Sequence, residues 1–230
     1  MTIKLYDLCA ADRDVRFSPY CWIVKFALLH KGLDFEIEPL NFIEKQKYPD
    51  PDYGKLPILV DDGEVICDSP VIVAHLEKKY PARPLVATDG ERAFANFLTA
   101  WLGASVYPSL APITFVQVHK ILDDETKKYF RETREKRFGK TLEEVGSDPA
   151  AGAQLEKAFG VLGAALGSRQ FLGGASANLC DYIAVSPLIW RRIVTPEPAC
   201  NLPAPVDAWM VRMLDLFDGY ARNAKRGRPA

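Results

Sequence analysis

The sequence predicts two domains, an α/β domain over residues 1–81 and an all-helical domain over residues 91–230. In the first domain the order is strand, helix, strand, an irregular link, strand, strand, helix. From Glu91 onward the strand signals disappear and helical periodicity continues to the end. The segment 82–90 between them opens with a proline-rich stretch and is predicted to be a linker.

The first strand is predicted over Thr2–Leu8, where apolar residues alternate in part with polar ones. A helix follows over Ser18–Lys31, with apolar residues at helical spacing and Gly32 as its stop. Leu33–Leu40 is predicted to be the second strand. If both strands share a sheet, this β-α-β unit is a right-handed parallel crossover.

Two further strands are predicted over Leu56–Val60 and Glu64–Cys67. The residues between them include Asp62-Gly63, and Asp-Gly between strands is a strong hairpin signal, so these strands should be antiparallel. Ser69–Tyr80 returns to helical spacing and should end before the next proline. In the second domain, helices are predicted over about 91–119, 123–145, 151–168, 178–193 and 205–223.

The composition excludes several classes of protein. The chain has 230 residues, of which 48% are hydrophobic and 26% charged, so it is globular rather than disordered. A net charge of -1 disfavours nucleic-acid binding. Five scattered cysteines and three distant histidines indicate no disulfide framework and no metal site. With no export signal and no apolar run long enough to cross a membrane, we expect a cytoplasmic protein.

Two helices of the first domain begin with the same dipeptide, Ser18-Pro19 and Ser69-Pro70. Serine caps a helix N-terminus, and proline fits its first position. The unpaired N–H groups at such an end also attract anions. Ser-Pro is equally an ordinary helix start, and Ser186-Pro187 lies inside an apolar helical run. Two such ends in one small domain suit a ligand with two negative groups.

The first of these helix starts resembles the C-P-Y-C corner of glutaredoxin and thioredoxin-like proteins, with Ser18 in place of the first cysteine. A serine hydroxyl cannot exchange disulfides, but it can donate a hydrogen bond to a thiolate. The thiol should therefore come from a ligand. Pro57 lies at the entrance of a strand. A cis bond between Leu56 and Pro57 would turn the backbone of Leu56 outward to pair with an extended peptide, and the sequence does not choose between cis and trans.

The chain resembles the cytosolic glutathione transferases. The resemblance is carried by the S-P-Y helix start, the G-K-L-P-I-L segment 54–59, the Asp-Gly hairpin and Asp68-Ser69, in that order. In the second half, Asn178 and Asp181 are similar to the family's N-capping box. The resemblance implies a thioredoxin-like N-terminal domain, a helical C-terminal domain, glutathione as co-substrate and a homodimer.

The resemblance also implies roles for individual residues. Ser18 would hydrogen-bond the glutathione sulfur, and the backbone of Leu56, before Pro57, would pair with the cysteinyl part. Asp68 and Ser69 would hold the γ-glutamyl end. Residues that could bind the glycyl carboxylate are Lys55 and one of Lys45, Gln46 and Lys47, among which the sequence does not choose.

The implied reaction is attack of the glutathione thiolate on a hydrophobic, aromatic electrophile. The S-P-Y corner, the F-L-G-G segment 171–174 and the segment 216–219 look closest to bacterial β-aryl etherases and related fungal serine-type enzymes, which suggests ether cleavage. Candidates for the wall of the second-substrate site are Trp101, Tyr107, Phe115 and Trp190, although each is equally suited to a helical core. The charged run 131–137 is typical of a solvated helix face.

Two other functions remain open. Cys21 occupies the resolving position of the corner and is expected to be a packing thiol, while Cys9 follows the first strand and is a candidate for direct disulfide chemistry. If activity on a mixed disulfide depended on Cys9 or Cys21, the protein would be a glutathione-dependent thiol-disulfide reductase. The fold could also serve as a non-catalytic binding or dimerisation module.

Overall fold

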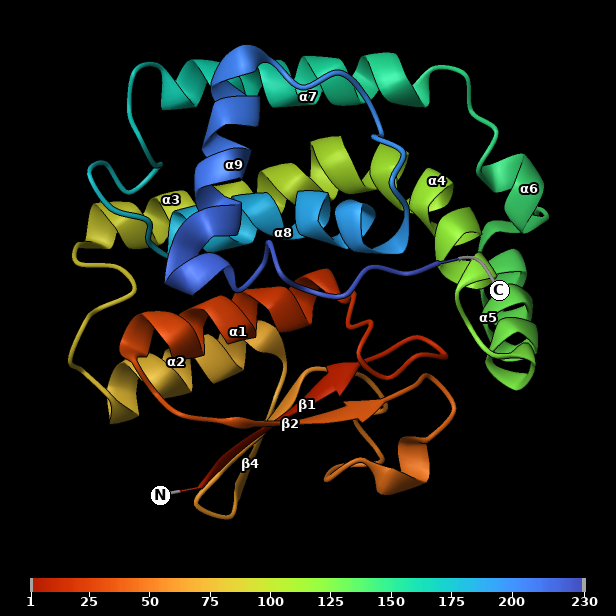
Figure 1. Cartoon of the computed structure of the whole chain (residues 1–230), viewed down its shortest axis with the longest axis horizontal. Helices are drawn as coiled ribbons and strands as arrows, with labels where there is room; N and C mark the ends of the chain where they lie inside the picture. The colour runs from red at the N-terminus through yellow and green to blue at the C-terminus, as the bar shows by residue number, and fades with distance from the viewer. Residues whose placement is uncertain (1, 229–230) are drawn as a thin grey trace.

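The structure, a computed structural model, describes residues 2–228. Positions 1, 229 and 230, the outermost residues of the two predicted domains, lie outside the described residues. An N-terminal α/β part with a four-stranded sheet precedes a helical part, which confirms the predicted fold class (Figure 1). The elements are β1 (Ile3–Leu8), α1 (Pro19–Lys31), β2 (Glu36–Leu40), a 3-10 turn (Lys45–Lys47), β3 (Ile58–Asp61), β4 (Glu64–Cys67), α2 (Ser69–Lys79), α3 (Asp89–Trp101), a π-helical segment (Leu102–Val106), α4 (Tyr107–Lys120), α5 (Asp124–Phe138), α6 (Leu142–Val145), α7 (Ala151–Leu166), α8 (Leu179–Val194) and α9 (Ala204–Gly219).

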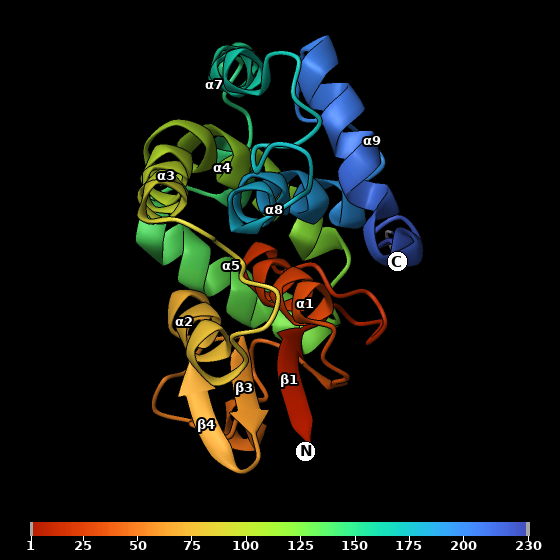
Figure 2. The same ribbon diagram turned by 90° about the vertical axis from the view of Figure 1, so that its left-hand side faces the viewer.

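The sheet has the order β2-β1-β3-β4. β1 and β2 are parallel, which confirms the crossover, and β3 and β4 form the predicted antiparallel hairpin. At its turn Asp62 and Gly63 have φ angles of 51° and 91°. Both are positive, as a tight two-residue hairpin turn requires. Helices α1 and α2 lie between the sheet and the helical domain in both views (Figure 2).

The predicted helix 91–119 is interrupted in the structure. α3 ends at Trp101, and a π-helical segment leads into α4. Pro108 has no backbone N–H and cannot make the hydrogen bond of a regular helix, so the backbone departs from α-helical pairing just before it, whereas Pro112 lies inside α4, which continues past it.

The predicted helices 123–145 and 205–223 also end earlier than expected. Gly139 stops α5 with φ 66°, and Thr141 then caps the short helix α6. In α9 the residues Phe217 and Asp218 take left-handed φ values of 54° and 57°, so the regular helix ends before them. Each break follows from a local backbone conformation that apolar periodicity does not register.

Helix α8 lies at the centre of the molecule. All its residues except Leu179 and Arg192 are buried, and it packs against α1 of the sheet domain. At this interface the ring of Phe26 stacks on Tyr182, with centroids 5.2 Å apart. The two domains therefore share one hydrophobic core. Among residues 2–228, no helix has the length and apolar character needed to span a bilayer.

Candidate functional site

The strand register brings the predicted site residues to one edge of the sheet. Tyr6 of β1 pairs with Ile58 of β3, which in turn pairs with Cys67 of β4. The end of β1, the start of β3 and the end of β4 therefore lie side by side. The segments that follow or precede these points carry Ser18, the Leu56-Pro57 peptide and the Asp68-Ser69 pair.

Ser18 caps helix α1 as predicted. Its Oγ accepts a hydrogen bond from the backbone N–H of Cys21 at 3.3 Å, and Pro19 occupies the first helical position. The serine is 4% exposed. Because this bond uses the oxygen only as an acceptor, the hydroxyl proton remains available to donate to a ligand atom at the helix N-terminus.

Helix α1 is fixed to the sheet by a buried ion pair. The Lys25 Nζ lies 2.8 Å from Asp7 Oδ2, and both side chains are at most 1% exposed. Burial lowers the pKa of Lys25, and the Asp7 carboxylate opposes that change. A buried pair of this kind holds α1, and with it Ser18, in one position on β1.

The backbone of Leu56 is open to a partner. Its peptide bond to Pro57 is cis, and Pro57 is buried at the entrance of β3. Among residues 2–228, neither the N–H nor the C=O of Leu56 has a hydrogen-bond partner. This is the arrangement that an extended peptide needs to add itself to a strand edge.

The start of α2 differs by one residue from the sequence-based expectation. The N-cap is Asp68 rather than Ser69, and Ser69 is the first helical residue. Asp68 has φ 74°, a conformation that is costly for a residue other than glycine and tends to occur at functional sites. Burial, and then the Asp68 charge, raise the pKa of Tyr20. Asp68 therefore lies close to the start of α1 as well.

The structure distinguishes the three candidates at the 3-10 turn. Lys47 donates to Glu44 at 2.6 Å, whereas the Nζ of Lys45 is directed toward the Gly54 backbone, 3.8 Å from where a Cβ there would lie. Gln46 is exposed. Lys55 is also exposed, next to Leu56. Lys45 and Lys55 are thus the lysines beside the open Leu56 peptide.

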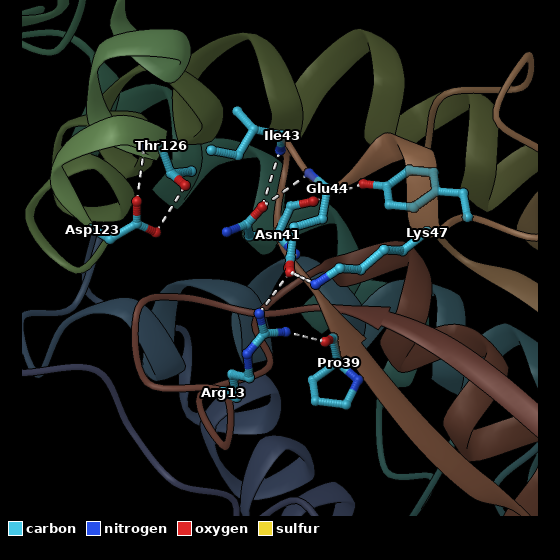
Figure 3. A network of polar contacts seen from close by, with 9 residues as sticks. Arg13, Pro39, Asn41, Ile43, Glu44, Lys47, Asp123 and Thr126 are labelled. Carbon is cyan, nitrogen blue, oxygen red and sulfur yellow. Dashed lines mark hydrogen bonds and ion pairs between the residues drawn. The ribbon is translucent and has the colours of Figure 1, made fainter.

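Glu44 organises the segment that carries Lys45 (Figure 3). Its carboxylate accepts hydrogen bonds from Arg13 at 2.7 Å, from Lys47 and from the backbone N–H of Asn41 at 3.0 Å. Burial acts to raise the pKa of Glu44, but these hydrogen bonds outweigh it and lower the pKa to about 2. The ionised carboxylate is therefore the stabilising form.

We expect Glu44→Gln to lower the melting temperature at neutral pH. The folded pKa of Glu44 is about 2, below the ordinary value of 4.5, so its contribution is complete above about pH 4.5 and is lost as the pH falls toward 2. Thermal unfolding of both proteins at pH 7, 4 and 2.5 measures this. The difference in melting temperature should shrink with the pH, and a constant difference would contradict the assignment.

The cysteines near the site are poorly suited to redox chemistry. Burial raises the pKa of Cys21 well above its ordinary value and that of Cys9 to about 12. A thiol with so high a pKa is not ionised at neutral pH, and the thiolate is the reactive form. Both residues are buried and free, which favours a packing role.

A continuous series of aromatic contacts begins and ends beside Ser18. Neighbouring ring centroids lie 5.3 to 6.4 Å apart. In order, the rings of this aromatic cluster belong to Tyr20, Tyr107, Trp190, Phe115, Phe130, Phe42 and Phe17. Three of the four predicted wall residues belong to it, whereas Trp101 makes no ring contact within the described chain. The other members, Tyr20, Phe130, Phe42 and Phe17, come from separate segments that only the fold brings together, so no local sequence pattern predicts them.

Both domains match known family models. Residues 14–84 match the N-terminal domain of glutathione S-transferases, and residues 93–220 match their C-terminal domain. The chain therefore belongs to the glutathione S-transferase family.

Its relatives agree with this assignment. The chain is 32% identical over 132 residues to a zeta-class glutathione S-transferase of Euphorbia esula, covering 54% of this chain and 55% of that protein. It is 35% identical over 94 residues to a maleylacetoacetate isomerase of Pseudomonas aeruginosa, covering 37% and 44%. The chain thus spans about half the length of the curated relatives it matches.

Solved structures match over nearly the whole chain. A glutathione transferase from Phanerochaete chrysosporium has a TM-score of 0.76 at 26% identity, covering 95% of this chain and 92% of that one. A glutathione S-transferase of Ceriporiopsis subvermispora in complex with glutathione has a TM-score of 0.75 at 23% identity, covering 95% and 93%. The second likeness shows the shared fold.

Proposed function

We propose that the protein binds glutathione at the sheet edge and that the glutathione sulfur attacks an electrophilic carbon, so that the whole tripeptide becomes attached to it. The observation that carries this proposal is the register of β1, β3 and β4, which brings Ser18, Leu56 and the Asp68-Ser69 pair to one place. These residues supply a hydroxyl donor, an open peptide backbone and a helix N-terminus. The family membership and the glutathione complex of a structural relative support it.

Glutathione is an extended tripeptide with a carboxylate at each end. In this proposal its cysteinyl part pairs with the backbone of Leu56, and its thiol meets the hydroxyl of Ser18. The γ-glutamyl carboxylate lies at the N-terminus of α2, where Ser69 and the free N–H groups attract an anion, and its ammonium lies near Asp68. The glycyl carboxylate reaches Lys45, with Lys55 beside it.

The chemical step needs a thiolate. A hydroxyl hydrogen bond and the N-terminus of α1 both favour the ionised sulfur. Lowering a thiol pKa by about 2 units corresponds to about 2.7 kcal/mol. The sulfur then bonds to the electrophilic carbon, the leaving group departs with its electron pair, and the thiol proton passes to water. The aromatic cluster beside Ser18 suits a hydrophobic, aromatic second substrate.

Titration calorimetry and a conjugation assay test the proposal. We expect glutathione to bind, and its sulfur to displace chloride from 1-chloro-2,4-dinitrobenzene in the presence of the protein. Absence of heat on adding glutathione would overturn the binding site. Binding without turnover of any aromatic electrophile would support the non-catalytic module instead.

Removal of the Lys45 charge should weaken glutathione binding. We expect Lys45→Met to raise the Kd for glutathione roughly 5- to 10-fold, because a charge-assisted contact contributes on the order of 1 kcal/mol at a partly exposed site. Lys47→Met is the matched control, since Lys47 is engaged with Glu44. Calorimetry on the three proteins measures the effect, and equal Kd values would show that Lys45 does not contact the ligand.

The identity of the leaving group defines the substrate class more closely. The sequence resemblance to β-aryl etherases supports a phenolate leaving group, so we propose β-aryl ethers as one class of substrate. Release of a phenol, with glutathione attached to the other fragment, is the expected result. Stable ethers under conditions where the chlorinated aromatic reacts would restrict the activity to conjugation.

We further propose a homodimer in the cytoplasm. The family resemblance supports the dimer, and the free cysteines suit a reducing compartment. Sedimentation of the purified protein gives its oligomeric state directly.

A further inference from the structure

Arg134 of α5 lies where the two domains meet. Its Cζ is 4.1 Å from the ring centroid of Phe130, 4.9 Å from that of Phe42 and 5.8 Å from that of Phe115. Phe42 belongs to the sheet domain and Phe115 to α4. The side chain is half-buried against these rings, so Arg134 departs from the solvated face expected for the run 131–137, in which Glu132, Lys136 and Arg137 are exposed.

Arg134 lacks an acidic partner, in contrast to Arg131 one turn earlier. Arg131 forms ion pairs with Glu135 and Glu143, each at 2.8 Å. Among residues 2–228, no carboxylate pairs with Arg134, whose one hydrogen bond is donated to Thr133 Oγ1 at 2.8 Å. Its remaining N–H groups lack an acceptor within the described chain.

A half-buried guanidinium without a carboxylate partner is an unfavourable arrangement. Burial lowers the pKa of Arg134. Contact with three rings compensates in part, because the ring faces attract a cation. The edge of the guanidinium, which carries the N–H donors, is left without an anion. An incoming carboxylate would therefore gain two charge-assisted hydrogen bonds.

A series of ring contacts connects Arg134 to Ser18, the proposed site of the glutathione sulfur. Phe42 contacts Phe17 at 6.1 Å, and Phe17 directly precedes Ser18. Arg137 follows on the same side of α5 and also forms no ion pair with the part of the chain that the structure describes. The raised pKa of Tyr20, caused first by burial and then by Asp68, is opposed by the charge of Arg137. Arg137 thus lies near the start of α1.

We propose that the preferred second substrate carries a carboxylate, and that Arg134, assisted by Arg137, binds this group beside the aromatic cluster. The inference rests on the proposed glutathione transfer and adds the substrate class to it. A planar guanidinium fork matches the two oxygens of a carboxylate. The electrophilic carbon of such a substrate is then held between the carboxylate contact and the sulfur at Ser18.

A matched pair of probes tests the inference: 4-chloro-3-nitrobenzoate and its methyl ester. In both, the glutathione sulfur bonds to the ring carbon that bears chlorine, chloride leaves with the bonding electrons, and the thiol proton goes to water. The quantity measured is the ratio of kcat/KM for the acid to that for the ester. Intrinsic reactivity cancels when this ratio is compared between variants.

We expect Arg134→Gln to lower this ratio 10- to 100-fold, and Arg134→Lys to lower it less, because lysine keeps the charge without the fork. Arg131→Gln is the matched control on the same helix and should leave the ratio unchanged. Arg137→Gln, an exposed position, should lower it roughly threefold, and it keeps the test decisive if Arg134→Gln does not fold.

An unchanged ratio in both the Arg134 and the Arg137 variants would overturn the inference. So would an equal fall in the Arg131 control. Turnover of the ester by the unmodified protein distinguishes failure of the carboxylate site from failure of the transferase function. If the ester reacts and the acid-to-ester ratio does not change in the variants, only the carboxylate site is wrong. If neither probe reacts while 1-chloro-2,4-dinitrobenzene does, the carboxylate-bearing substrate class is wrong and the transferase function stands. If none of the three reacts, the transferase function itself is wrong.

Discussion

Ser18→Ala is expected to reduce kcat/KM for conjugation about 30-fold, with a change in the glutathione Kd of less than about threefold. The hydroxyl is the side-chain donor at the N-terminus of α1, and a hydrogen bond to a charged group contributes roughly 1.5–3 kcal/mol. A loss of about 2 kcal/mol of transition-state stabilisation corresponds to a reduction of about 30-fold in kcat/KM. The Kd changes less because, in the proposed binding mode, most contacts to the tripeptide come from Leu56, Ser69 and Lys45.

The same substitution also removes a helix cap. Loss of the bond from Cys21 N–H to Ser18 Oγ should cost about 1 kcal/mol of folding free energy, so urea unfolding must accompany the kinetics. Ser18→Thr is the control, because threonine keeps both the cap and the hydroxyl donor. Full activity of the alanine variant with several electrophiles would remove Ser18 from the reaction.

Asp181→Ala is expected to lower the free energy of unfolding by about 3–5 kcal/mol. The buried carboxylate accepts hydrogen bonds from Leu172 N at 2.8 Å, Gly173 N at 3.0 Å, Asn178 N at 3.1 Å and Trp209 Nε1 at 2.8 Å. Alanine leaves these donors unsatisfied. Each unsatisfied buried donor costs roughly 1–3 kcal/mol, and the costs of neighbouring donors do not add fully. Helix α8, which Asp181 helps to cap, is the central element of the shared core.

Urea unfolding of the purified variants measures this effect. Asp207→Ala, an exposed position in the first turn of α9, is the matched control and should change the free energy of unfolding by less than about 0.5 kcal/mol. Asp181→Asn should lie between the two, because its amide keeps one acceptor oxygen. A loss below 1 kcal/mol for Asp181→Ala would show that water or rearranged loops satisfy the four donors.

Features encoded within a few residues could be predicted from the sequence. The Asp-Gly hairpin, the cap at Ser18 and the box formed by Asn178 and Asp181 each involve partners no more than three residues apart, and the structure contains all three. The bond from Trp209 to Asp181 spans 28 positions, and no local pattern indicates it. The N-cap at Asp68 was missed for another reason, because its positive φ comes from the backbone path out of β4.

The candidate site was predictable only in part. Motif order indicates Ser18, Leu56 and the start of α2, but it does not choose among Lys45, Gln46 and Lys47. In the structure Lys47 donates to Glu44, Lys45 is directed toward Gly54, and Gln46 is exposed. The partial burial of Arg134 could not be predicted, because charge alternation along a helix does not show which residues pack against it. Gly139 is a helix stop and Thr141 a helix N-cap, but apolar periodicity continues across both and therefore predicts one helix over 123–145.

The pKa of the glutathione thiol in the bound state tests the proposed role of Ser18 most directly. Thiolate absorbance near 240 nm, followed over pH for the complexes of the unmodified protein and of Ser18→Ala, measures it. We predict a bound thiol pKa about 2 units below that of free glutathione, and a return of at least 1 unit toward the free value in the variant. The same bound pKa in both proteins, or no shift from free glutathione, would contradict the claim that Ser18 stabilises the thiolate.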